Sequence, residues 1–290
     1  MHSVGAIIVL YYPDCEHVAR MLIALRDSVD YMILVDNSET ASQLNLCPNA
    51  YYMHMGSNVG IAAAQNRGLK RLLELSCDYA FLFDQDSTIS VNFIRDMLNA
   101  FFSSTDETLA AIGPQVVCNY IGKNEQPKLQ KPYRHVGNFQ YVRQIISSGM
   151  LIDLDKLKKV GMKEEDLFID GVDHEWCWRA ATLDYSVAIT SKVEMNHQMG
   201  IERKNFLGIS YKVGQAIRHY YQVRNILLLM RRPYVPMYWK LRNSAMIVLR
   251  LILVILQGEN KAARLKYMFL GFMDGLKGKK GKLGQYKKPV

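Results

Sequence analysis

Short apolar runs and longer amphipathic stretches alternate through the first half of the chain. The continuous apolar runs predict buried strands at residues 6–11, 31–35, 51–54, 79–83 and 109–117. The stretches with apolar residues every three or four positions predict helices at residues 15–28, 61–75 and 91–102. Because such strands alternating with helices form parallel sheets covered on both faces, we expect an α/β fold. Ligands of such sheets bind beyond the carboxyl ends of the strands.

The second half becomes helical towards its end. Residues 118–141 are polar and poorly periodic, which predicts a mobile connection. Beyond them we expect a strand at 145–152, a helix at 173–183 and a strand at 186–189. Helical periodicity then dominates, at residues 210–230, 237–257 and 260–276. Residues 275–290 are rich in glycine and lysine, which predicts a flexible basic tail.

The net charge of +9 is concentrated at the C-terminal end. Residues 234–290 hold twelve lysines and arginines against only Glu259 and Asp274, so the preceding residues are close to neutral. This asymmetry favours a polyanionic partner. An anionic membrane surface fits better than nucleic acid, because the tail has few aromatic residues for base stacking. The five cysteines form no CxxC pair, which indicates a reduced protein.

Two carboxylates follow the predicted strand at 79–83, in the sequence Asp84-Gln85-Asp86. At the point where the strand ends they can converge on one hard cation, such as Mg²⁺ or Mn²⁺, which shares oxygen ligands with phosphates. A surface turn is the alternative, because aspartate is common after strands. His197 is a candidate for completing the ion site, although a lone histidine is also compatible with a structural role.

Two further segments are candidates for binding a nucleotide. Asp36 ends the strand at 31–35 and can accept hydrogen bonds from a ribose or a base, or simply form a turn with the next two residues. The segment from Asn58 to Gly68 has small residues where the helix at 61–75 begins, which permits close approach of a ligand or of a packed strand. It matches neither GxGxxG nor GxxxxGK[ST], which disfavours dinucleotide and P-loop sites.

A cluster of carboxylates lies just before and within the helix predicted at 173–183. Asp170, Asp173 and Glu175 fall within six residues and are flanked by aromatic residues, among them Trp176. A carboxylate near aromatic surface can have a raised pKa and act as a base towards an alcohol. The alternative for Asp173 is to cap the helix.

Taken in order, these segments resemble the family 2 inverting glycosyltransferases of the GT-A fold, over about residues 4–232. The stretches most similar to rhamnosyltransferases are Asp84-Gln85-Asp86-Ser87, Ser148-Gly149, residues 168–179 and residues 220–225. The sequence departs from the commoner family pattern at Val172, where a glutamate usually precedes the base.

The resemblance implies a GT-A domain, with a Rossmann-like and mostly parallel sheet, at residues 1–232. Residues 233–290 lie outside the resemblance, and their own pattern predicts basic amphipathic helices and a tail that associate with a membrane. The resemblance also implies a divalent cofactor, Mn²⁺ or Mg²⁺, held by Asp84, Asp86 and His197, and Asp173 as the catalytic base. The implied donor-binding residues are Tyr11, Asp36, Asn58, Gly60, Asn66, Asp84 and Arg224. Acceptor-side candidates are Asp170, Glu175 and Trp176. Arg224 is also compatible with a place on a helix surface.

The function that follows is transfer of a sugar, best matched by L-rhamnose from dTDP-rhamnose, to a hydroxyl of a lipid-linked cell-surface glycan. A UDP-hexose or UDP-galactofuranose donor is the alternative within this class. From another class, the chain would be a non-catalytic, membrane-associated binder of nucleotide sugars.

The predicted location is the cytoplasmic face of the cell membrane. Residues 235–257 are strongly apolar, but Lys240, Arg242 and Arg250 interrupt them, so the uncharged runs between these residues are too short to cross ~30 Å of hydrocarbon. A helix buried against the catalytic domain is one interpretation. Aromatic residues at its start and the lysine cluster after it favour a helix lying on an anionic membrane surface.

Overall fold

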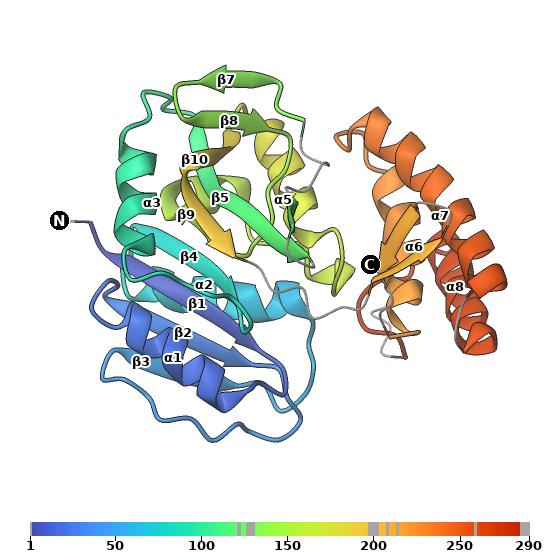
Figure 1. The fold of residues 1–290 in the computed structure, drawn as a ribbon, viewed down its shortest axis with the longest axis horizontal. Helices are drawn as coiled ribbons and strands as arrows, with labels where there is room; N and C mark the ends of the chain where they lie inside the picture. Colours follow the sequence, from blue (N-terminus) through green and yellow to red (C-terminus); the bar gives the residue numbers. More distant parts are fainter. Residues whose placement is uncertain are drawn as a thin grey trace. The chain divides into compact units, whose positions relative to one another are not determined.

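The computed structural model describes residues 2–120, 123–125, 131–196, 203–206, 209–212, 215–257 and 260–284. The chain divides into two compact units (Figure 1). The N-terminal unit comprises Met1–Glu165 and Val172–Gln198, and the C-terminal unit comprises Asp166–Gly171 and Met199–Val290. Residues 166–171 therefore belong with the C-terminal helices. His197, a predicted metal ligand, lies outside the described residues.

Four parallel strands form the first half of the main sheet. Their order is β3 (Ala50–His54), β2 (Tyr31–Asp36), β1 (Val4–Leu10) and β4 (Tyr79–Asp84). Every residue of β1 is buried, so both faces of this strand are covered. On one face, Ile7 and Val9 share a core cluster with Ala64 of α2 (Ile61–Glu74). Figure 1 shows α1 (Cys15–Leu25) across the opposite face.

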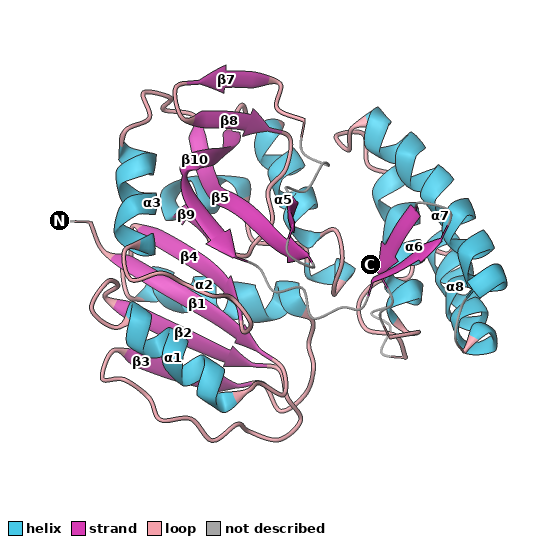
Figure 2. Cartoon of the chain, viewed as in Figure 1, coloured by secondary structure: helices cyan, strands magenta, loops and turns pink. Residues whose placement is uncertain are grey.

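The second half of the sheet is mixed in direction. β9 (Met150–Asp153) runs antiparallel between β4 and β5 (Leu109–Tyr120), and β10 (Ser186–Asn196) runs parallel to β5. The remaining strands are β6 (Lys123–Glu125), which pairs with β5, and an edge hairpin of β7 (Arg134–Val136) and β8 (Phe139–Val142). The other helices of this unit are α3 (Phe93–Phe102), α4 (Leu154–Val160) and α5 (Val172–Ala181). The predicted α/β fold with a mostly parallel sheet and helices on both faces is confirmed (Figure 2).

Several stretches of this unit differ from the sequence prediction, among them β10, which continues to Asn196, and α4, which was not predicted. Residues 118–141, expected to be a mobile connection, contain β7 and most of β8. The guanidinium of Arg134 lies 3.8 Å from the ring centre of Tyr141 and 2.6 Å from Asp106 Oδ2, and such contacts leave no periodic pattern in the sequence. The strand expected at 145–152 begins only at Met150, because the chain turns at Gly149 with a φ of 74°.

Helices dominate the C-terminal unit (Figure 2). Its described elements are the hairpin β11 (Arg203–Phe206) and β12 (Ile209–Lys212), followed by α6 (Arg218–Met230), α7 (Met237–Gln257) and α8 (Lys261–Leu276). Two glycines of α8 let it approach α6 closely. A Cβ atom on Gly275 would lie 2.8 Å from the side chain of Leu227, and one on Gly271 would meet the backbone of Tyr220. The helix predicted at 210–230 is wrong at its start, where residues up to 212 belong to β12.

The first part of the basic tail is ordered. Gly281 N donates a hydrogen bond to Asp166 O at 2.7 Å, and Leu283 N donates one to the Tyr221 hydroxyl at 3.1 Å. Lys280 Nζ lies 2.8 Å from Asp166 Oδ2. The prediction of a flexible tail is therefore wrong as far as residue 284, because these contacts fix it to residues 166–171 and to α6.

The C-terminal unit also bears on the predicted domain boundary and on membrane insertion. α6 is grouped with α7 and α8, whereas the sequence places it at the end of residues 1–232. Because a compact unit does not define a catalytic domain, the boundary at 232 stays a prediction. Within the part of the chain that the structure describes, no helix is long and apolar enough to cross a membrane.

Candidate active site

Several predicted site residues lie along one edge of the main sheet, at the carboxyl ends of its parallel strands. Leu10 is paired with Asp36 across β1 and β2, and Val9 is paired with Asp84 across β1 and β4. Tyr11 directly follows Leu10 and lies at the same edge. The register of the strands thus brings Tyr11, Asp36 and Asp84 to the edge where ligands bind in sheets of this kind.

Asp84 and Asp86 belong to a turn that is anchored by the residue between them. The side chain of Gln85 accepts a hydrogen bond from Tyr11 N at 2.6 Å and donates one to Tyr11 O at 3.2 Å. Ser87 N donates to Asp84 O at 3.1 Å and closes the turn. Asp84 is partly buried and Asp86 is exposed, so the turn presents two carboxylates on a fixed backbone.

The ligand chemistry of this turn suits a hard divalent cation. Mg²⁺ and Mn²⁺ prefer oxygen ligands, and Asp84 and Asp86 supply two carboxylates while leaving coordination positions for phosphate oxygens. Among the residues that the structure describes, no group of three or more His, Cys, Asp and Glu side chains is placed to hold a metal. The predicted third ligand, His197, is outside those residues.

Asp36 is buried and bonded to its own chain. Its Oδ1 accepts a hydrogen bond from Ser38 N at 2.9 Å, and its Oδ2 accepts from Ser42 N at 3.0 Å and from the Tyr52 hydroxyl at 2.6 Å. Burial alone would raise the pKa of Asp36, but these hydrogen bonds outweigh it and hold the pKa well below the ordinary value. Burial and the neighbouring Asp36 raise the pKa of Tyr52 to about 12. Asp36 therefore holds the loop after β2 and is 0% exposed, and the donor contact that the sequence predicts for it stays a prediction.

The predicted nucleotide segment before and within α2 divides into two parts. Asn58 Oδ1 accepts a hydrogen bond from Gly60 N at 3.0 Å, and Gly60 has a φ of 88°, so these residues shape the turn that starts α2. Asn66 is 2% exposed, and its amide bonds Lys163 N at 2.9 Å and Lys163 O at 2.8 Å. The side chain of Asn66 therefore holds the backbone of Lys163, and its contact with the donor stays a prediction.

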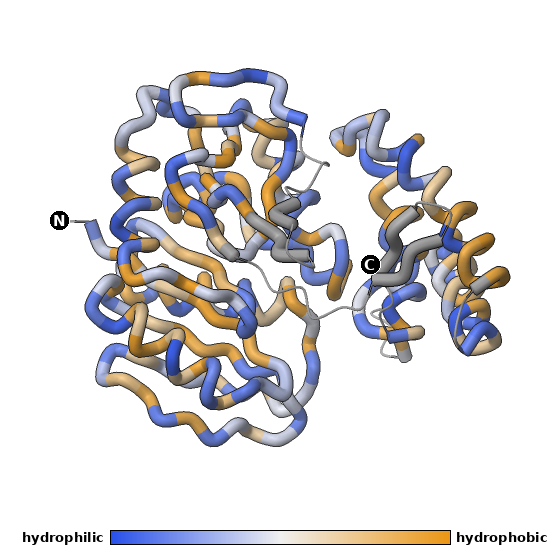
Figure 3. Tube along the Cα trace, in the orientation of Figure 1, coloured by the Kyte–Doolittle hydropathy of each residue, from blue (hydrophilic) through white to orange (hydrophobic). Residues whose placement is uncertain are grey.

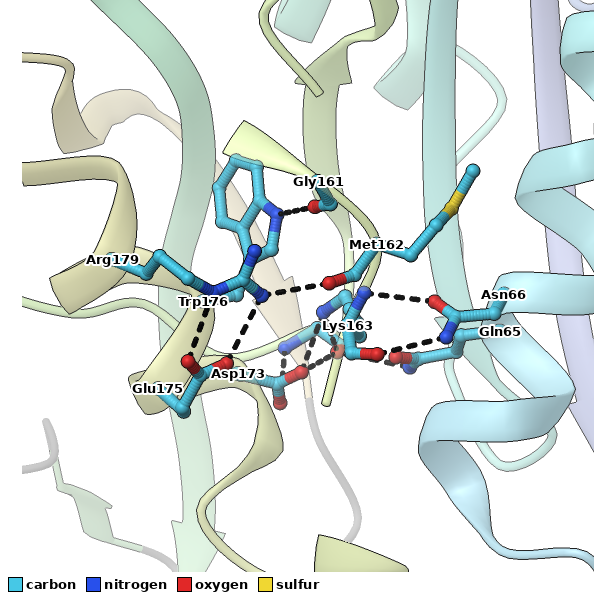
Figure 4. A network of polar contacts seen from close by, with 10 residues as sticks. Gln65, Asn66, Gly161, Met162, Lys163, Asp173, Glu175, Trp176 and Arg179 are labelled. Carbon is cyan, nitrogen blue, oxygen red and sulfur yellow. Dashed lines mark hydrogen bonds and ion pairs between the residues drawn. The ribbon is translucent and has the colours of Figure 1, made fainter. Parts of the chain in front are cut away.

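Asp173, the predicted base, lies at the start of α5 in a polar network (Figure 4). Its Oδ1 accepts hydrogen bonds from Lys163 Nζ at 2.7 Å and from the Ser147 hydroxyl, and its Oδ2 accepts from Ser147 N at 3.1 Å. Burial raises the pKa of Asp173, but Lys163 and Ser147 outweigh it and lower the pKa below the ordinary value. The expectation that aromatic surroundings raise this pKa is wrong, because a buried ammonium lies beside the carboxylate.

Glu175 and Trp176, the acceptor-side candidates on α5, are fully buried and bonded within the protein (Figure 4). Glu175 forms two hydrogen bonds with Arg179, at 2.9 and 3.1 Å, and Arg179 also donates to Met162 O at 2.7 Å. Trp176 Nε1 donates to Gly161 O at 3.0 Å. Together they hold the segment that leads to Lys163, and their place on the acceptor side stays a prediction.

A short loop connects the aspartate turn with the network around Asp173. Ser148 Oγ lies 3.0 Å from the Oγ of Ser87, the residue that follows Asp86. Ser147, the residue before Ser148, forms a hydrogen bond with Asp173. Gly149 N donates to Leu82 O of β4 at 2.8 Å. The predicted metal turn and the predicted base are therefore linked through consecutive residues of one loop.

Two predicted site residues lie in the C-terminal unit. Asp170 accepts two hydrogen bonds from Arg218, at 3.1 and 2.8 Å, and its side chain is 23% exposed. Arg224 is fully buried and donates to Gly281 O and, at 2.9 Å, to Leu167 O. Backbone carbonyls of its own unit accept hydrogen bonds from its guanidinium, and the contact of Arg224 with the donor diphosphate stays a prediction.

One curated relative aligns with this chain over nearly the full length of both proteins. The dTDP-rhamnosyl transferase RfbF of Shigella flexneri is 30% identical over 294 residues, which make up 95% of this chain and 96% of RfbF. The chain belongs to the rhamnosyltransferase-like glycosyltransferases. This glycosyltransferase is also 23% identical to the low-salt glycan biosynthesis hexosyltransferase Agl10 of Haloferax volcanii, over 76% of this chain and 75% of Agl10. No family model matches the sequence.

Solved glycosyltransferase structures share the fold at lower identity. GalNAc-T7 with UDP, GalNAc and Mn²⁺ aligns with a TM-score of 0.54 at 10% identity, and S. aureus TarS with 0.50 at 13%. The alignments cover 96% and 80% of the glycosyltransferase but 56% and 40% of the solved chains, so it spans about half their length. The GT-A fold expected from the sequence is confirmed.

Sequence reasoning missed two residues of the glycosyltransferase that contact Asp173. Lys163 precedes Glu164 and Glu165, and such a run of charges is typical of a solvated surface, yet its side chain is 0% exposed. Ser147 precedes the Ser148-Gly149 motif and has no pattern of its own. Neither residue has a spacing relative to Asp173 that a sequence motif records, so only the folded chain brings them together.

Proposed function

We propose that this glycosyltransferase transfers L-rhamnose from dTDP-rhamnose to a hydroxyl of a lipid-linked cell-surface glycan, with inversion at C1. The observation that carries the proposal is the relation to RfbF, a dTDP-rhamnosyl transferase, over nearly the full length of both chains. The arrangement of Asp84, Asp86 and Asp173 supports it, since each retains some exposure while the neighbouring Asp36 and Glu175 are closed off.

In the proposed reaction, Asp173 takes the proton of the acceptor hydroxyl as the oxygen attacks C1 of the rhamnosyl group. The new bond forms on the face opposite the diphosphate, while the C1–O bond to the diphosphate breaks and its electron pair leaves with dTDP. Tyr11 and Asn58, which keep exposed surface at the edge of the sheet, would contact the nucleoside, and Gly60 would allow its close approach. Asp170 stays a candidate on the acceptor side because it is partly exposed.

A divalent metal is part of this proposal. Asp84 and Asp86, together with His197, would hold Mn²⁺ or Mg²⁺, and the bound ion would neutralise charge that develops on the leaving diphosphate. The supporting observation is the fixed turn that carries the two carboxylates. The Mn²⁺ in the GalNAc-T7 structure shows that one protein of this fold was crystallised with such an ion.

The test is a donor panel with lipid-linked acceptors, in Mn²⁺, Mg²⁺ or EDTA. We expect transfer from dTDP-rhamnose, its loss in EDTA, and a loss of about a hundredfold or more for Asp86→Ala with the fold intact. Asp27→Ala is the matched control, because Asp27 lies on the surface of the same unit. Full activity in chelator would contradict the metal site. If only a UDP-hexose or UDP-galactofuranose is turned over, that nucleotide sugar is the donor and dTDP-rhamnose is not. Binding of a nucleotide sugar without turnover of any donor would favour a non-catalytic binder.

We infer that the enzyme is peripheral to the cytoplasmic face of the cell membrane, held by its C-terminal helices. On α7, the exposed side chains of Met237, Leu241, Val248, Ile252 and Ile255 fall within about 60° of one another around the helix axis. Exposed apolar residues also follow one side of α8, at Phe269, Phe272 and Leu276. Figure 3 shows these apolar stretches along both helices.

Charge supports an anionic partner for this apolar surface. Arg242, Lys261, Lys266 and Lys277 are exposed on α7 and α8 or directly after them. Each basic residue near an anionic leaflet contributes about 1 kcal/mol, and inserted apolar side chains add to that. Lys279 and Lys280 contribute less than their sequence suggests, because they pair with Asp274 and Asp166. A lipid-linked acceptor would be met at the same surface.

A further inference from the structure

We propose that Lys163 is a positioning residue for Asp173 and that it selects Oδ2 as the carboxylate oxygen that receives the acceptor proton. The inference rests on the proposed role of Asp173 as the base. It assigns a function to a lysine that no motif of the sequence marks.

The first support is the burial of the ammonium group. The Lys163 side chain is 0% exposed, and Nζ lies 2.7 Å from Asp173 Oδ1 and 3.2 Å from Ser147 Oγ. A buried ammonium is unfavourable unless a counter-charge and hydrogen-bond acceptors surround it. The Asp173 side chain is 26% exposed, so the ion pair is closed on the lysine side and open on the carboxylate side.

The second support is that the two carboxylate oxygens are not equivalent. Oδ1 accepts hydrogen bonds from the Lys163 ammonium and from the Ser147 hydroxyl. From the residues that the structure describes, Oδ2 accepts one, from Ser147 N at 3.1 Å. Because a carboxylate oxygen has two lone pairs, Oδ1 is saturated and Oδ2 retains one. The proton of the acceptor hydroxyl therefore transfers to Oδ2, while Lys163 and Ser147 keep their bonds to Oδ1.

The third support is the rigidity of the frame around Lys163 (Figure 4). Asn66 of α2 bonds both the N–H and the carbonyl of Lys163, across 97 residues of sequence. Gln65 Nε2 donates to Ser147 Oγ at 3.0 Å. Arg179 and Trp176 of α5 hold the preceding residues. A side chain fixed from two helices can orient a carboxylate with little loss of freedom on substrate binding.

Electrostatics gives this arrangement a measurable consequence. The charged groups around Asp173 are Lys163, His174 next to it on α5, Glu175 paired with Arg179, and Glu165, which accepts a hydrogen bond from Asn66. Burial raises the pKa of Asp173, and Lys163 is the largest of the influences that lower it. Loss of the ammonium removes the largest influence that opposes burial and leaves the weaker ones of Ser147 and His174. The pKa of the base should then rise, so that more of it is protonated and inactive at low pH.

The experiment is the pH profile of kcat/KM for the full-length enzyme and for Lys163→Met. We expect the acidic limb to move upward by about one pH unit or more, so that activity lost at low pH recovers as the pH rises. Lys163→Arg should keep the limb near the wild-type position. Lys156→Met is the matched control, because Lys156 forms a half-buried pair with Asp153, at 3.3 Å, elsewhere in the same unit. An unmoved limb in Lys163→Met, with activity reduced equally at every pH, would overturn the inference.

A second variant separates this inference from the proposed function. Asp173→Asn should lower kcat by ~10²–10⁴-fold if Asp173 is the base. If Asp173→Asn keeps more than about a tenth of the activity, the base assignment fails. If it is inactive while Lys163→Met leaves the limb unmoved, only the role of Lys163 fails. Should Lys163→Met not fold, the wild-type protein decides: the Asp173 carboxyl should titrate below 3.8 by NMR, and titration at or above that value contradicts the proposal.

Discussion

At the scale of single residues, exposure and partners separate the carboxylates that the sequence groups together. Asp36 and Glu175 are fully buried and bonded to their own chain, which makes them parts of the frame. Asp86 is exposed on a fixed turn, and Asp173 is paired yet reachable. A motif shows where acidic residues lie along the chain. Their exposure and the hydrogen bonds that they accept show which of them can contact a substrate.

The depressed pKa of Asp36 predicts how stability depends on pH. Because the folded pKa lies below the unfolded value of about 3.9, the stabilisation is fully present above that value and is lost as the pH falls below it. Asp36→Asn should be less stable at neutral pH and should lose less stability on acidification than the wild type. Denaturant midpoints between about pH 6 and pH 3 measure this difference.

The control for Asp36 is Asp27→Asn, because the Asp27 side chain is 83% exposed. It should follow the acid sensitivity of the wild type. Equal loss of stability on acidification in Asp36→Asn and in the wild type would contradict the role given to the Asp36 hydrogen bonds.

At the scale of elements, the local hydrophobic pattern predicts those helices and strands whose bounds are set by local interactions. The helix expected at 237–257 has the bounds of α7, and the strand-end position of Asp84 follows from its apolar strand. The hairpin of β7 and β8 was not predictable, since Arg134 and Tyr141 hold it through contacts without periodicity. The hydrogen bond between Asn66 and Lys163 could not be predicted from the sequence for the same reason, because it joins residues 97 apart.

The packing of α6 against α8 predicts that Gly271 cannot carry a side chain. A Cβ atom there would meet the carbonyl of Tyr220, and a backbone group cannot move aside cheaply. Gly271→Val should lower the unfolding free energy by about 1–3 kcal/mol or more, through overpacking. Thermal unfolding measures the loss.

Ala262→Val is the control for this helix, because Ala262 is exposed on α8 and a valine there carries the same β-branched penalty. It should cost less than about 1 kcal/mol. Equal stability of Gly271→Val and Ala262→Val would show that α6 and α8 do not approach as closely as described.

At the scale of the whole molecule, the two compact units have different surfaces. The N-terminal unit holds the sheet edge and the network of Asp173, and the C-terminal unit carries the apolar stripe of α7 with exposed basic residues around it. Sequence composition predicted this division of charge, but it did not predict that residues 166–171 belong with the C-terminal unit.

Membrane binding can be tested on the stripe itself. In sedimentation with vesicles that contain an anionic phospholipid, the double variant Leu241→Glu and Ile252→Glu should bind at least about tenfold more weakly than the wild type. High salt should weaken wild-type binding only in part, because apolar insertion is not screened. Val91→Glu is the control, since Val91 is 78% exposed in the N-terminal unit. A double variant that sediments like the wild type would exclude this stripe as the membrane contact.

Residues 166–171 have a further consequence during synthesis. The carbonyl of Leu167 accepts hydrogen bonds from Arg224 and Asn225, 57 and 58 residues later, and that of Asp166 accepts from Gly281. A ribosome makes about 5–20 residues per second, so this segment emerges before any of its partners exist. On a nascent chain, residues 166–171, which precede the helix of Asp173, therefore lack these hydrogen bonds. A nascent chain that has not reached residue 281 would lack the bond from Gly281 to Asp166, so the segment would gain this anchor only after residue 281 has been made.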